Sequence, residues 1–313
     1  MRRFLKIFKI ARGSAAILSK LIFFGEFVAV GHCFAAVLHT LLLYNMNFNF
    51  FKKEKPNKKL GLALGSGGAK GMAHIGILRA FEEEDINFDI VTGCSIGSIV
   101  GGLYARGFST ANMLNSLKEL KLYDPQSVVY YKLQGFSVKK LLDDMLGGVD
   151  FDELILPFAA VASDIDNGEQ VILSQGNVAA AMAASSAIPP VFRAVEINGK
   201  RLVDGAYFNN VPADVCKNMG AGTVIGVALS TDTPNNDKIK PALDALYRGN
   251  KIPVCDRASA GKQNSDVYLA PDLSAYTSSS YKGLDDMYEI GYEYAKAKMP
   301  EIKAFLRSKK IIK

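Results

Sequence analysis

Ser95 is the residue of this 313-residue chain that is best placed to act as a nucleophile. It lies in the segment GCSIG, between Gly93 and Gly97, where a predicted strand is followed by a predicted helix. A G-x-S-x-G at such a junction is typical of a nucleophile elbow, a tight turn that exposes the serine hydroxyl at the start of a helix. Covalent catalysis through this serine needs a base for the hydroxyl and hydrogen-bond donors for an oxyanion.

A glycine-rich segment earlier in the chain is the candidate for those donors. The sequence GSGGAKG, from Gly65 to Gly71, joins a predicted strand directly to a predicted helix, and amides at a helix N-terminus favour an anion. A phosphate loop is excluded because no Gly-Lys-Ser/Thr follows. A dinucleotide loop is excluded because Lys70 stands at the third glycine of that motif. The remaining option is the oxyanion that develops when a serine attacks an ester.

The chain has three histidines, His32, His39 and His74, and their positions exclude the common serine triads. An α/β-hydrolase needs its histidine after the serine, and none follows Ser95. The subtilisin order needs an aspartate before the histidine, and no aspartate precedes His74. The chymotrypsin order would pack a whole triad into one strand-helix-strand passage, whereas it belongs to β-barrels. A metal site built from several histidines is excluded in the body of the chain as well.

Asp204 is the strongest candidate for the base. It ends a short predicted strand in the segment RLVDGA, and Gly205 and Ala206 form the turn that follows. A carboxylate in a partly dry cleft has a raised pKa, so it can take the serine proton and later return it to the leaving group. Lys70 stays open as an alternative base, and His74 as either a structural or a catalytic residue. No metal or other cofactor is needed in this scheme.

The chain resembles the patatin-like phospholipases, and in particular the small bacterial members related to the catalytic domain of neuropathy target esterase. The resemblance rests on three segments that occur in this order: GSGGAKG, GCSIG and DGA. Other segments match as well, namely HIGIL from His74, ASSAIP from Ala184, NNVP from Asn209 and APDL from Ala270. The resemblance covers residues 58–307. It implies an α/β fold of three layers, α/β/α, with a mainly parallel central sheet.

The resemblance also implies a lipid acyl hydrolase of the phospholipase A or lysophospholipase type. Ser95 and Asp204 would form its dyad, and the amides of Gly67, Gly68 and Ala69 its oxyanion hole. The serine alkoxide would attack a lipid ester, and water would then release the fatty acid from the acyl-serine. Two alternatives stay open: a transacylase that passes the acyl group to a lipid hydroxyl, and a membrane-anchored lipid-binding regulator whose dyad is idle.

The chain departs from the family pattern in two places. Ser66 stands where the first glycine of the family's G-x-G-x-x-G lies, with Gly68 and Gly71 at the other two positions. Pro190 stands where a glycine is usual, and Arg193-Ala194 replaces a proline-rich pair. Neither departure touches the dyad, but the second is expected to reshape the acyl pocket.

Short β-rich runs alternate with helical stretches from Leu60 onward, which predicts an α/β domain with helices on both faces of a sheet. The predicted strands are Leu60–Leu64, Ile90–Thr92, Phe158–Ser163, Gln170–Leu173, Val191–Ile197, Leu202–Val203, Thr223–Ala228 and Val267–Leu269. The predicted helices are Gly71–Glu84, Ile96–Arg106, Ala111–Leu120, Val138–Leu146, Asn177–Ser186, Pro212–Met219 and Leu284–Lys298.

The net charge of +6 is unevenly distributed along the chain. Residues 1–60 carry 11 Lys and Arg against two acids, and residues 61–313 carry 26 against 29. The body therefore has no basic field that would attract nucleic acid, and nucleic-acid binding is not expected. The four cysteines show no C-x-x-C spacing, which predicts neither a zinc cluster nor a disulfide framework.

Residues 1–50 form a basic and apolar N-terminal part, followed by a Lys- and Asn-rich linker at residues 51–59 and the patatin-like domain at residues 60–313. Leu21–Tyr44 is long and apolar enough to cross a bilayer as a helix, although it contains Glu26. Basic residues flank it on both sides, so the side of the membrane stays undetermined. The alternatives are an interfacial helix at residues 2–12 and a start at Met46, which would make the protein cytoplasmic.

Overall fold

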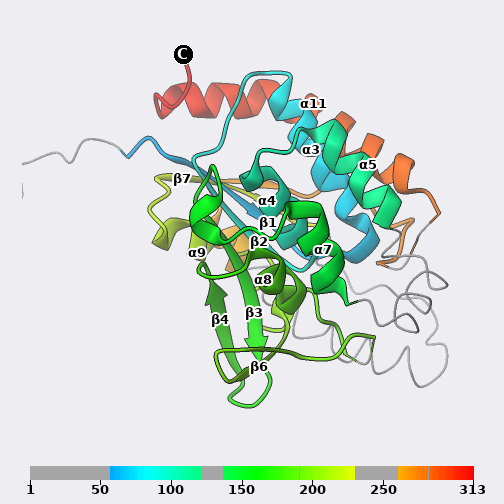
Figure 1. Cartoon of the computed structure of the whole chain (residues 1–313). Helices are drawn as coiled ribbons and strands as arrows, with labels where there is room; N and C mark the ends of the chain where they lie inside the picture. The colour runs from blue at the N-terminus through cyan, green and yellow to red at the C-terminus, as the bar shows by residue number, and fades with distance from the viewer. Residues whose placement is uncertain (1–56, 121–136, 190, 230–259, 279, 281) are drawn as a thin grey trace, which may run out of the picture. The chain divides into compact units, whose positions relative to one another are not determined.

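The computed structural model describes residues 57–120, 137–189, 191–229, 260–278, 280 and 282–313, which belong to one unit, Asn57–Lys313 (Figure 1). The apolar segment Leu21–Tyr44, the interfacial segment 2–12, the linker residues before Asn57 and Pro190 lie outside these residues. Within the described ranges, no helix is both long and apolar enough to cross a membrane. The expectation of an N-terminal membrane helix is therefore not tested by the structure.

The described residues form an α/β structure around one eight-stranded sheet. Its strands are β1 (Leu60–Leu64), β2 (Ile90–Cys94), β3 (Phe158–Asp164), β4 (Glu169–Leu173), β5 (Val195–Ile197), β6 (Lys200–Asp204), β7 (Thr223–Val227) and β8 (Val267–Leu269). The order is β5-β6-β3-β2-β1-β7-β8, and β4 also pairs with β3. The α/β class and all eight predicted strands are confirmed, with small shifts at most strand ends and a predicted start at Val191 that moves to Val195.

The sheet is mixed, which corrects the expectation that it is mainly parallel. Strands β3, β2, β1, β7 and β8 run parallel to one another. β4 and β6 run antiparallel to β3, and β5 antiparallel to β6. Two of these antiparallel pairings are local, because β3–β4 and β5–β6 are hairpins whose short turns reverse the chain at Gly168 and at Asn198-Gly199, all with positive φ. The third, between β6 and β3, joins segments that are distant in the chain.

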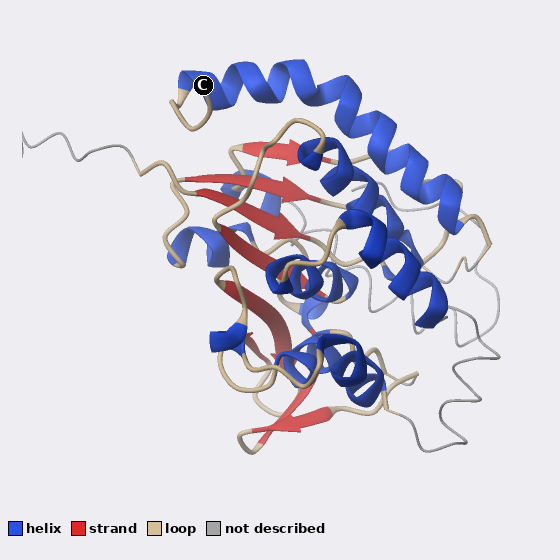
Figure 2. Cartoon of the chain, turned by 45° about the horizontal axis from the view of Figure 1, so that its top comes forward, coloured by secondary structure: helices blue, strands red, loops and turns tan. Residues whose placement is uncertain are grey.

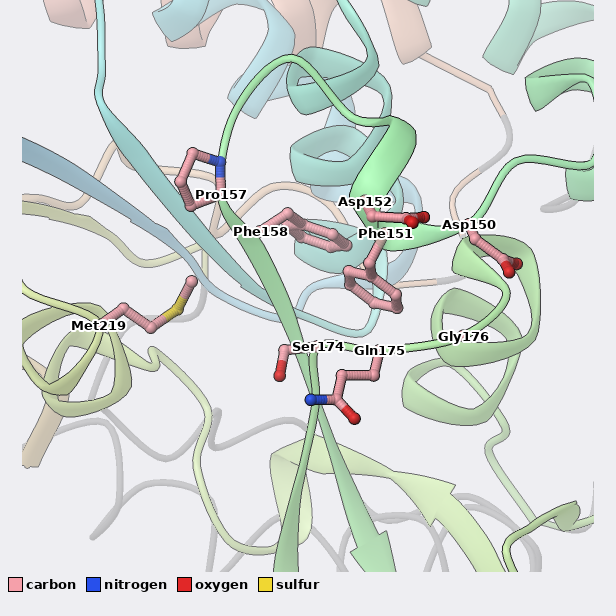
Figure 3. Close-up of a pocket in the computed structure, with 9 residues that line it drawn as sticks. All are labelled: Asp150, Phe151, Asp152, Pro157, Phe158, Ser174, Gln175, Gly176 and Met219. Carbon is pink, nitrogen blue, oxygen red and sulfur yellow. The ribbon is translucent and has the colours of Figure 1, made fainter.

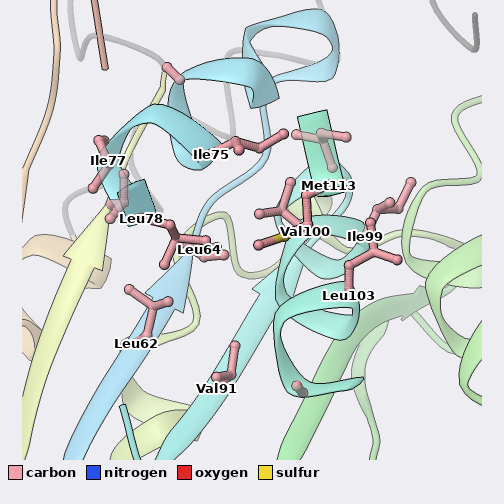
Figure 4. Close-up of a cluster of buried hydrophobic side chains, with 14 of the residues drawn as sticks. Leu62, Leu64, Ile75, Ile77, Leu78, Val91, Ile99, Val100, Leu103 and Met113 are labelled. Carbon is pink, nitrogen blue, oxygen red and sulfur yellow. The ribbon is translucent and has the colours of Figure 1, made fainter. Parts of the chain in front are cut away.

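Helices cover the sheet on both faces. They are α3 (Met72–Glu82), α4 (Ile96–Arg106), α5 (Thr110–Leu120), α7 (Val138–Leu146), α8 (Val178–Ser185), α9 (Ala213–Asn218) and α11 (Leu284–Ser308), with 3-10 turns η2 (Gly68–Gly71), η3 (Phe151–Glu153) and η4 (Gly205–Tyr207). Along β1, Leu62 and Leu64 join the large cluster that includes α3 and α4 (Figure 4). Ala63 points to the other face, where Ala213 and Cys216 of α9 cover it. Both faces of this strand are therefore buried, as a parallel strand under helices requires.

Helix α11 packs along α3, beside which it runs as the long helix in Figure 2. The two backbones approach closely, since a Cβ on Gly76 would lie 2.0 Å from the Tyr288 carbonyl oxygen. The predicted end at Lys298 is wrong, because α11 continues through Pro300 to Ser308. A proline inside a helix costs about 3 kcal/mol. The residues that offset this cost are buried on one face of the helix on either side of the proline: Met299, Ile302 and Leu306.

Candidate active site

Strand β3 brings the two halves of the candidate site together. β2 pairs with the first half of β3, as far as Cys94 opposite Val161. β6 pairs with the second half, and its last residue, Asp204, lies opposite Ala162. β4 fills the other edge of β3 over this stretch, so β2 and β6 share one edge and meet end to end. Ser95, which follows β2, is therefore placed against Asp204.

Ser95 occupies a strained turn between β2 and α4. Its φ is 53° and its ψ is −126°, a conformation that residues with a side chain rarely adopt. Two glycines allow the turn to pack closely, since a Cβ on Gly97 would lie 2.2 Å from the Leu64 carbonyl oxygen and one on Gly93 would lie 2.3 Å from the Gly97 carbonyl oxygen. Ser95 Oγ donates a hydrogen bond to Asp204 Oδ2 over 2.5 Å. The structure thus brings the expected nucleophile and the expected base into contact.

Two other serines fix the backbone of Ser95. Its N–H donates to Ser185 Oγ at 2.9 Å, and that hydroxyl donates to the Val161 carbonyl at 2.6 Å. Ser98 Oγ donates to the Ser95 carbonyl at 2.7 Å. Because the Ser95 amide is already used, other amides must supply the donors for an oxyanion.

The surroundings of Asp204 favour a moderately basic carboxylate. Asp204 and Ser95 are 3% and 4% exposed. Burial raises the pKa of Asp204 to about 6, and the hydrogen bonds from the Ser95 hydroxyl and the Ala206 amide oppose this rise. The Ala206 amide donates to Oδ1 at 2.9 Å, and Ser163 Oγ donates to the Asp204 main-chain carbonyl at 2.8 Å. Such a group is ionised at neutral pH and is a stronger base than an exposed aspartate.

The residues that flank this pair pack against each other. A Cβ on Gly205 would lie 2.1 Å from the Val161 carbonyl oxygen. Cys94 Sγ lies 4.0 Å from Asp204 Oδ1. Burial raises the pKa of the Cys94 thiol, and the charge of Asp204 raises it further. Cys94 is therefore a neutral thiol beside the second carboxylate oxygen, a contact that the sequence does not indicate.

The glycine-rich segment Gly65–Gly71, here called the glycine loop, packs against the serine turn. A Cβ on Gly97 would lie 2.6 Å from the Gly65 carbonyl oxygen, and one on Gly71 would lie 2.0 Å from Ile96 Cγ1. A side chain at either position would push the loop away from Ser95. These close approaches explain why both motifs carry glycine at these points.

The amides of the glycine loop fall into two groups. Those with main-chain partners include Gly65 to the Val227 carbonyl at 2.9 Å, Ser66 to the Asn210 carbonyl at 3.2 Å, Ala69 to the Ser278 carbonyl at 2.8 Å and Lys70 to the Gly67 carbonyl at 3.3 Å. In the part of the chain that the structure describes, the amides of Gly67 and Gly68 donate to no main-chain carbonyl. The Ala69 amide differs from its expected role in an oxyanion hole, because the segment around Ser278 already occupies it.

Ser66, which stands in place of a glycine, is bound to Asn210. The Ser66 amide also lies 3.2 Å from Asn210 Oδ1, and the Ser66 hydroxyl donates to the same oxygen. Asn210 is fully buried and follows Asp204 closely in the chain. It therefore ties the glycine loop to the segment that carries the candidate base. In the sequence, Asn210 belongs to the segment NNVP that matches the family, but nothing in that segment identifies Ser66 as its partner.

Lys70 and His74, the other candidate bases, have other partners. Hydrogen bonding by Ser274 lowers the pKa of Asp272, and the charge of Lys70 adds to this effect. His74 is fully buried, and its Nε2–H donates to the Gly65 carbonyl at 2.8 Å. Burial lowers the pKa of His74 to about 4. The hydroxyl of Ser95 is directed instead at the carboxylate described above.

A hollow of about 450 Å³ lies at the opposite ends of the strands (Figure 3). Its walls come from the segments before β3, after β4 and after α9: Asp150–Asp152, Pro157, Phe158, Ser174–Gly176 and Met219. The ring of Phe151 stacks on that of Phe158 with centroids 5.6 Å apart. Neither Ser95 nor Asp204 lines this hollow. Across the described ranges, no cluster of three or more His, Cys, Asp or Glu side chains could hold a metal ion.

Comparison with known proteins gives one matching family model, described as patatin-like phospholipase, over residues 62–217. The chain is 39% identical over 290 residues to a patatin-like phospholipase domain-containing protein of Caenorhabditis elegans, covering 78% of this chain and 21% of that protein. It is 24% identical over 317 residues to a lysophospholipase of Candida albicans, covering 86% and 23%.

A bacterial relative is an uncharacterised protein of Mycobacterium bovis that is assigned to the NTE family. The chain is 34% identical to it over 192 residues, covering 60% of this chain and 52% of that protein. The chain spans about a fifth of the length of its animal relatives. The matched family region, residues 62–217, includes the glycine loop, Ser95 and Asp204.

Proposed function

We propose that this chain, which belongs to the patatin-like phospholipase family, hydrolyses acyl esters of lipids as a phospholipase A or lysophospholipase. Ser95 is the nucleophile and Asp204 the base of this reaction. The observation that carries the proposal is the 2.5 Å hydrogen bond from Ser95 Oγ to a buried Asp204 carboxylate. The likeness to a Candida albicans lysophospholipase supports the substrate class.

In the first step, Asp204 takes the proton of the Ser95 hydroxyl while Oγ attacks the ester carbonyl carbon. The amides of Gly67 and Gly68 then donate to the oxygen that becomes negatively charged, a role supported by their lack of main-chain partners in the described ranges. Collapse of the tetrahedral intermediate breaks the bond to the lipid alcohol. Asp204 returns its proton to that leaving oxygen, which leaves an acyl group on Ser95.

In the second step, Asp204 takes a proton from water and the hydroxide attacks the acyl-serine. The same two amides stabilise the second intermediate. Its collapse restores the Ser95 hydroxyl with the proton from Asp204 and releases the fatty acid. The raised pKa of Asp204, about 6, suits a group that must gain and lose this proton near neutral pH.

We place the reaction at a membrane surface, because residues 1–60 carry 11 Lys and Arg together with the apolar run Leu21–Tyr44. A basic flank next to an apolar segment binds anionic bilayers, where lipid esters are found. Residues 61–313, with a net negative charge, supply the chemistry and the N-terminal part supplies the contact with lipid.

The test is release of fatty acid from lysophospholipid and diacylphospholipid by the full chain, measured by mass spectrometry. Ser95→Ala is expected to lower the rate about 10,000-fold or more, because the acyl-enzyme cannot form. Ser174→Ala, which changes an exposed serine in the hollow, is the matched control and is expected to keep the wild-type rate. Wild-type release by Ser95→Ala would refute the assignment. New lipid ester in place of free fatty acid would indicate acyl transfer instead.

A further inference from the structure

His74 reaches back across the glycine loop from the first turn of α3. It is fully buried, and its Nε2 lies 2.8 Å from the carbonyl oxygen of Gly65, at the other end of the loop. This one bond closes a ring around the residues between them, which include Gly67 and Gly68. The loop is thus held to its own helix by a side chain as well as by the main chain.

The carbonyl that His74 binds is also the part of the loop that meets the serine turn. A Cβ on Gly97 would lie 2.6 Å from the Gly65 carbonyl oxygen. The N–H of the same peptide group belongs to Ser66, and it donates to the Asn210 carbonyl at 3.2 Å. His74 therefore holds the carbonyl side, and Asn210 the N–H side, of a peptide group that lies between the glycine loop and the turn that carries Ser95.

The imidazole of His74 acts as a neutral donor. Burial lowers its pKa to about 4, so the ring carries a single proton at neutral pH. A carbonyl oxygen can only accept, so that proton sits on Nε2, opposite Gly65. Nδ1 is then unprotonated, and it has no hydrogen-bond partner in the described part of the chain. The ring has its proton committed to the loop, which leaves Asp204 as the base for Ser95.

We propose that His74 is a positioning residue that holds the Gly65 carbonyl so that the Gly67 and Gly68 amides face the developing oxyanion. The inference rests on the proposed function. Glycines at two successive positions give the loop wide backbone freedom, so its direction must be fixed from outside. Without the donor, the buried Gly65 carbonyl loses its partner, and rotation of that peptide to find another turns the following amides away.

Three substitutions separate the donor from the bulk of the ring. His74→Gln places an amide nitrogen near the reach of Nε2. His74→Asn carries the same amide one bond shorter, so it cannot reach Gly65. His74→Leu fills space without any donor. For each variant, kcat and KM are measured on lysophospholipid, together with hydrogen exchange of the amides from Gly65 to Met72, and thermal unfolding reports which variants are folded.

His74→Gln is expected to keep kcat within about threefold of the wild type, whereas His74→Asn and His74→Leu lose about 10- to 100-fold in kcat at nearly constant KM. Exchange of the loop amides is expected to quicken in the second and third variants alone. If His74→Leu fails to fold, the Gln and Asn pair still decides the question. If His74→Gln and His74→Asn have equal kcat, whether both are fast or both are slow, the proposal is overturned.

The failure of this inference is distinct from failure of the proposed function. If Ser95→Ala still releases fatty acid at the wild-type rate, the proposed function is wrong whatever the His74 variants do. If Ser95→Ala is inactive and His74→Asn keeps wild-type kcat and exchange, the function stands and the positioning role of His74 falls.

Discussion

The two ends of the parallel strands differ in what they bury. At their carboxyl ends lie polar groups that are almost fully enclosed, among them Ser95, Ser185 and Asp204, and hydrogen bonds of 2.9 Å and 2.5 Å join Ser95 to the other two. At their amino ends lies the hollow of about 450 Å³, whose carboxylates at Asp150 and Asp152 are exposed. The carboxylates of the more open region therefore remain in contact with water, whereas that of Asp204 does not.

The region that we propose to be reactive is thus the one from which water is removed, and the open hollow is elsewhere. A carboxylate that is enclosed becomes a better base, because desolvation disfavours its charged form. A carboxylate in contact with water keeps its solvation, so its substitution has little effect on the free energy of unfolding. Substitutions at the two ends should therefore have very different effects.

After Ser95→Ala, the largest effect is expected for Asp204→Asn. The amide can still accept from Ala206 but cannot take the serine proton, so kcat should fall about 1,000-fold. Because the pKa of Asp204 is raised on folding from 3.8 to about 6, this group stabilises the fold most below pH 4, and the contribution is lost as pH rises through 6. At pH 8, the neutral amide should therefore raise the free energy of unfolding by about 1–3 kcal/mol.

Kinetics and urea unfolding at pH 8 check both parts of this prediction. A variant that loses activity because it is poorly folded would show a lower free energy of unfolding, opposite to the expected sign. Wild-type kcat in a folded Asp204→Asn variant would remove the base from the mechanism.

A smaller effect is expected for Gly97→Ala, which presses on the contact between the serine turn and the glycine loop. The new Cβ would lie 2.2 Å from the Leu64 carbonyl oxygen, which is main chain and cannot move aside cheaply. We expect a loss of about 1–3 kcal/mol in stability and about 100-fold in kcat from displacement of the reacting groups.

Gly101→Ala in the same helix is the matched control. Its Cβ would meet the side chain of Val91 at 3.0 Å, and a side chain can shift. Thermal unfolding and kcat of the two variants are compared. Equal effects would show that the loss reflects glycine in a helix and has no connection with the glycine loop.

The next effect is a pH dependence. Since the carboxylate of Asp204 must be ionised to accept the proton, kcat/KM should fall about tenfold per pH unit as the pH drops below about 6 and level off above it. This fall in kcat/KM at acidic pH should persist in His74→Gln, because the pKa of His74, about 4, lies below that of Asp204. Rates over pH 4.5–8, on a substrate without ionisable groups, would reveal it. If the fall at acidic pH is absent from His74→Gln, the titrating group is the His74 imidazole and not Asp204.

The smallest effect is expected at the amino ends of the strands. Asp152→Asn makes the same chemical change as Asp204→Asn, but on an exposed side chain in the hollow. We expect kcat within about twofold and a free energy of unfolding within about 0.5 kcal/mol of the wild type. A large loss of activity here would break the comparison and give the hollow a part in the reaction.

The sequence predicts the local features of the fold and less of what joins them. Ile96–Arg106 is confirmed residue by residue as α4, because the glycine turn before it and Gly107 after it are local signals. The path of β6 along the edge of β3 is not local, and it adds to the two hairpins an antiparallel pairing between distant segments. Pro300 gave a misleading stop, because the buried face that carries α11 past it depends on packing against α3.

At the candidate site, residue types pointed to Ser95 and Asp204, and the structure adds their contact. The partners of the glycine loop could not be predicted in the same way. Asn210 and Ser278 reach the loop from distant parts of the chain, and only the fold brings them there. The use of the Ala69 amide by Ser278 follows from this long-range packing, and no motif in the sequence encodes it.

The order of these parts along the chain has a consequence for protein synthesis. Ser95 leaves the ribosome first, Asp204 follows only after β3 to β6, and Ser278, whose carbonyl accepts from the Ala69 amide, follows later still. A nascent chain in which only Ser95 has been made has no base beside this serine. Its glycine loop also lacks the contact with Ser278. Under the proposed mechanism, a growing polypeptide becomes able to hydrolyse lipid only after Asp204 and Ser278 have both been made and have folded into place.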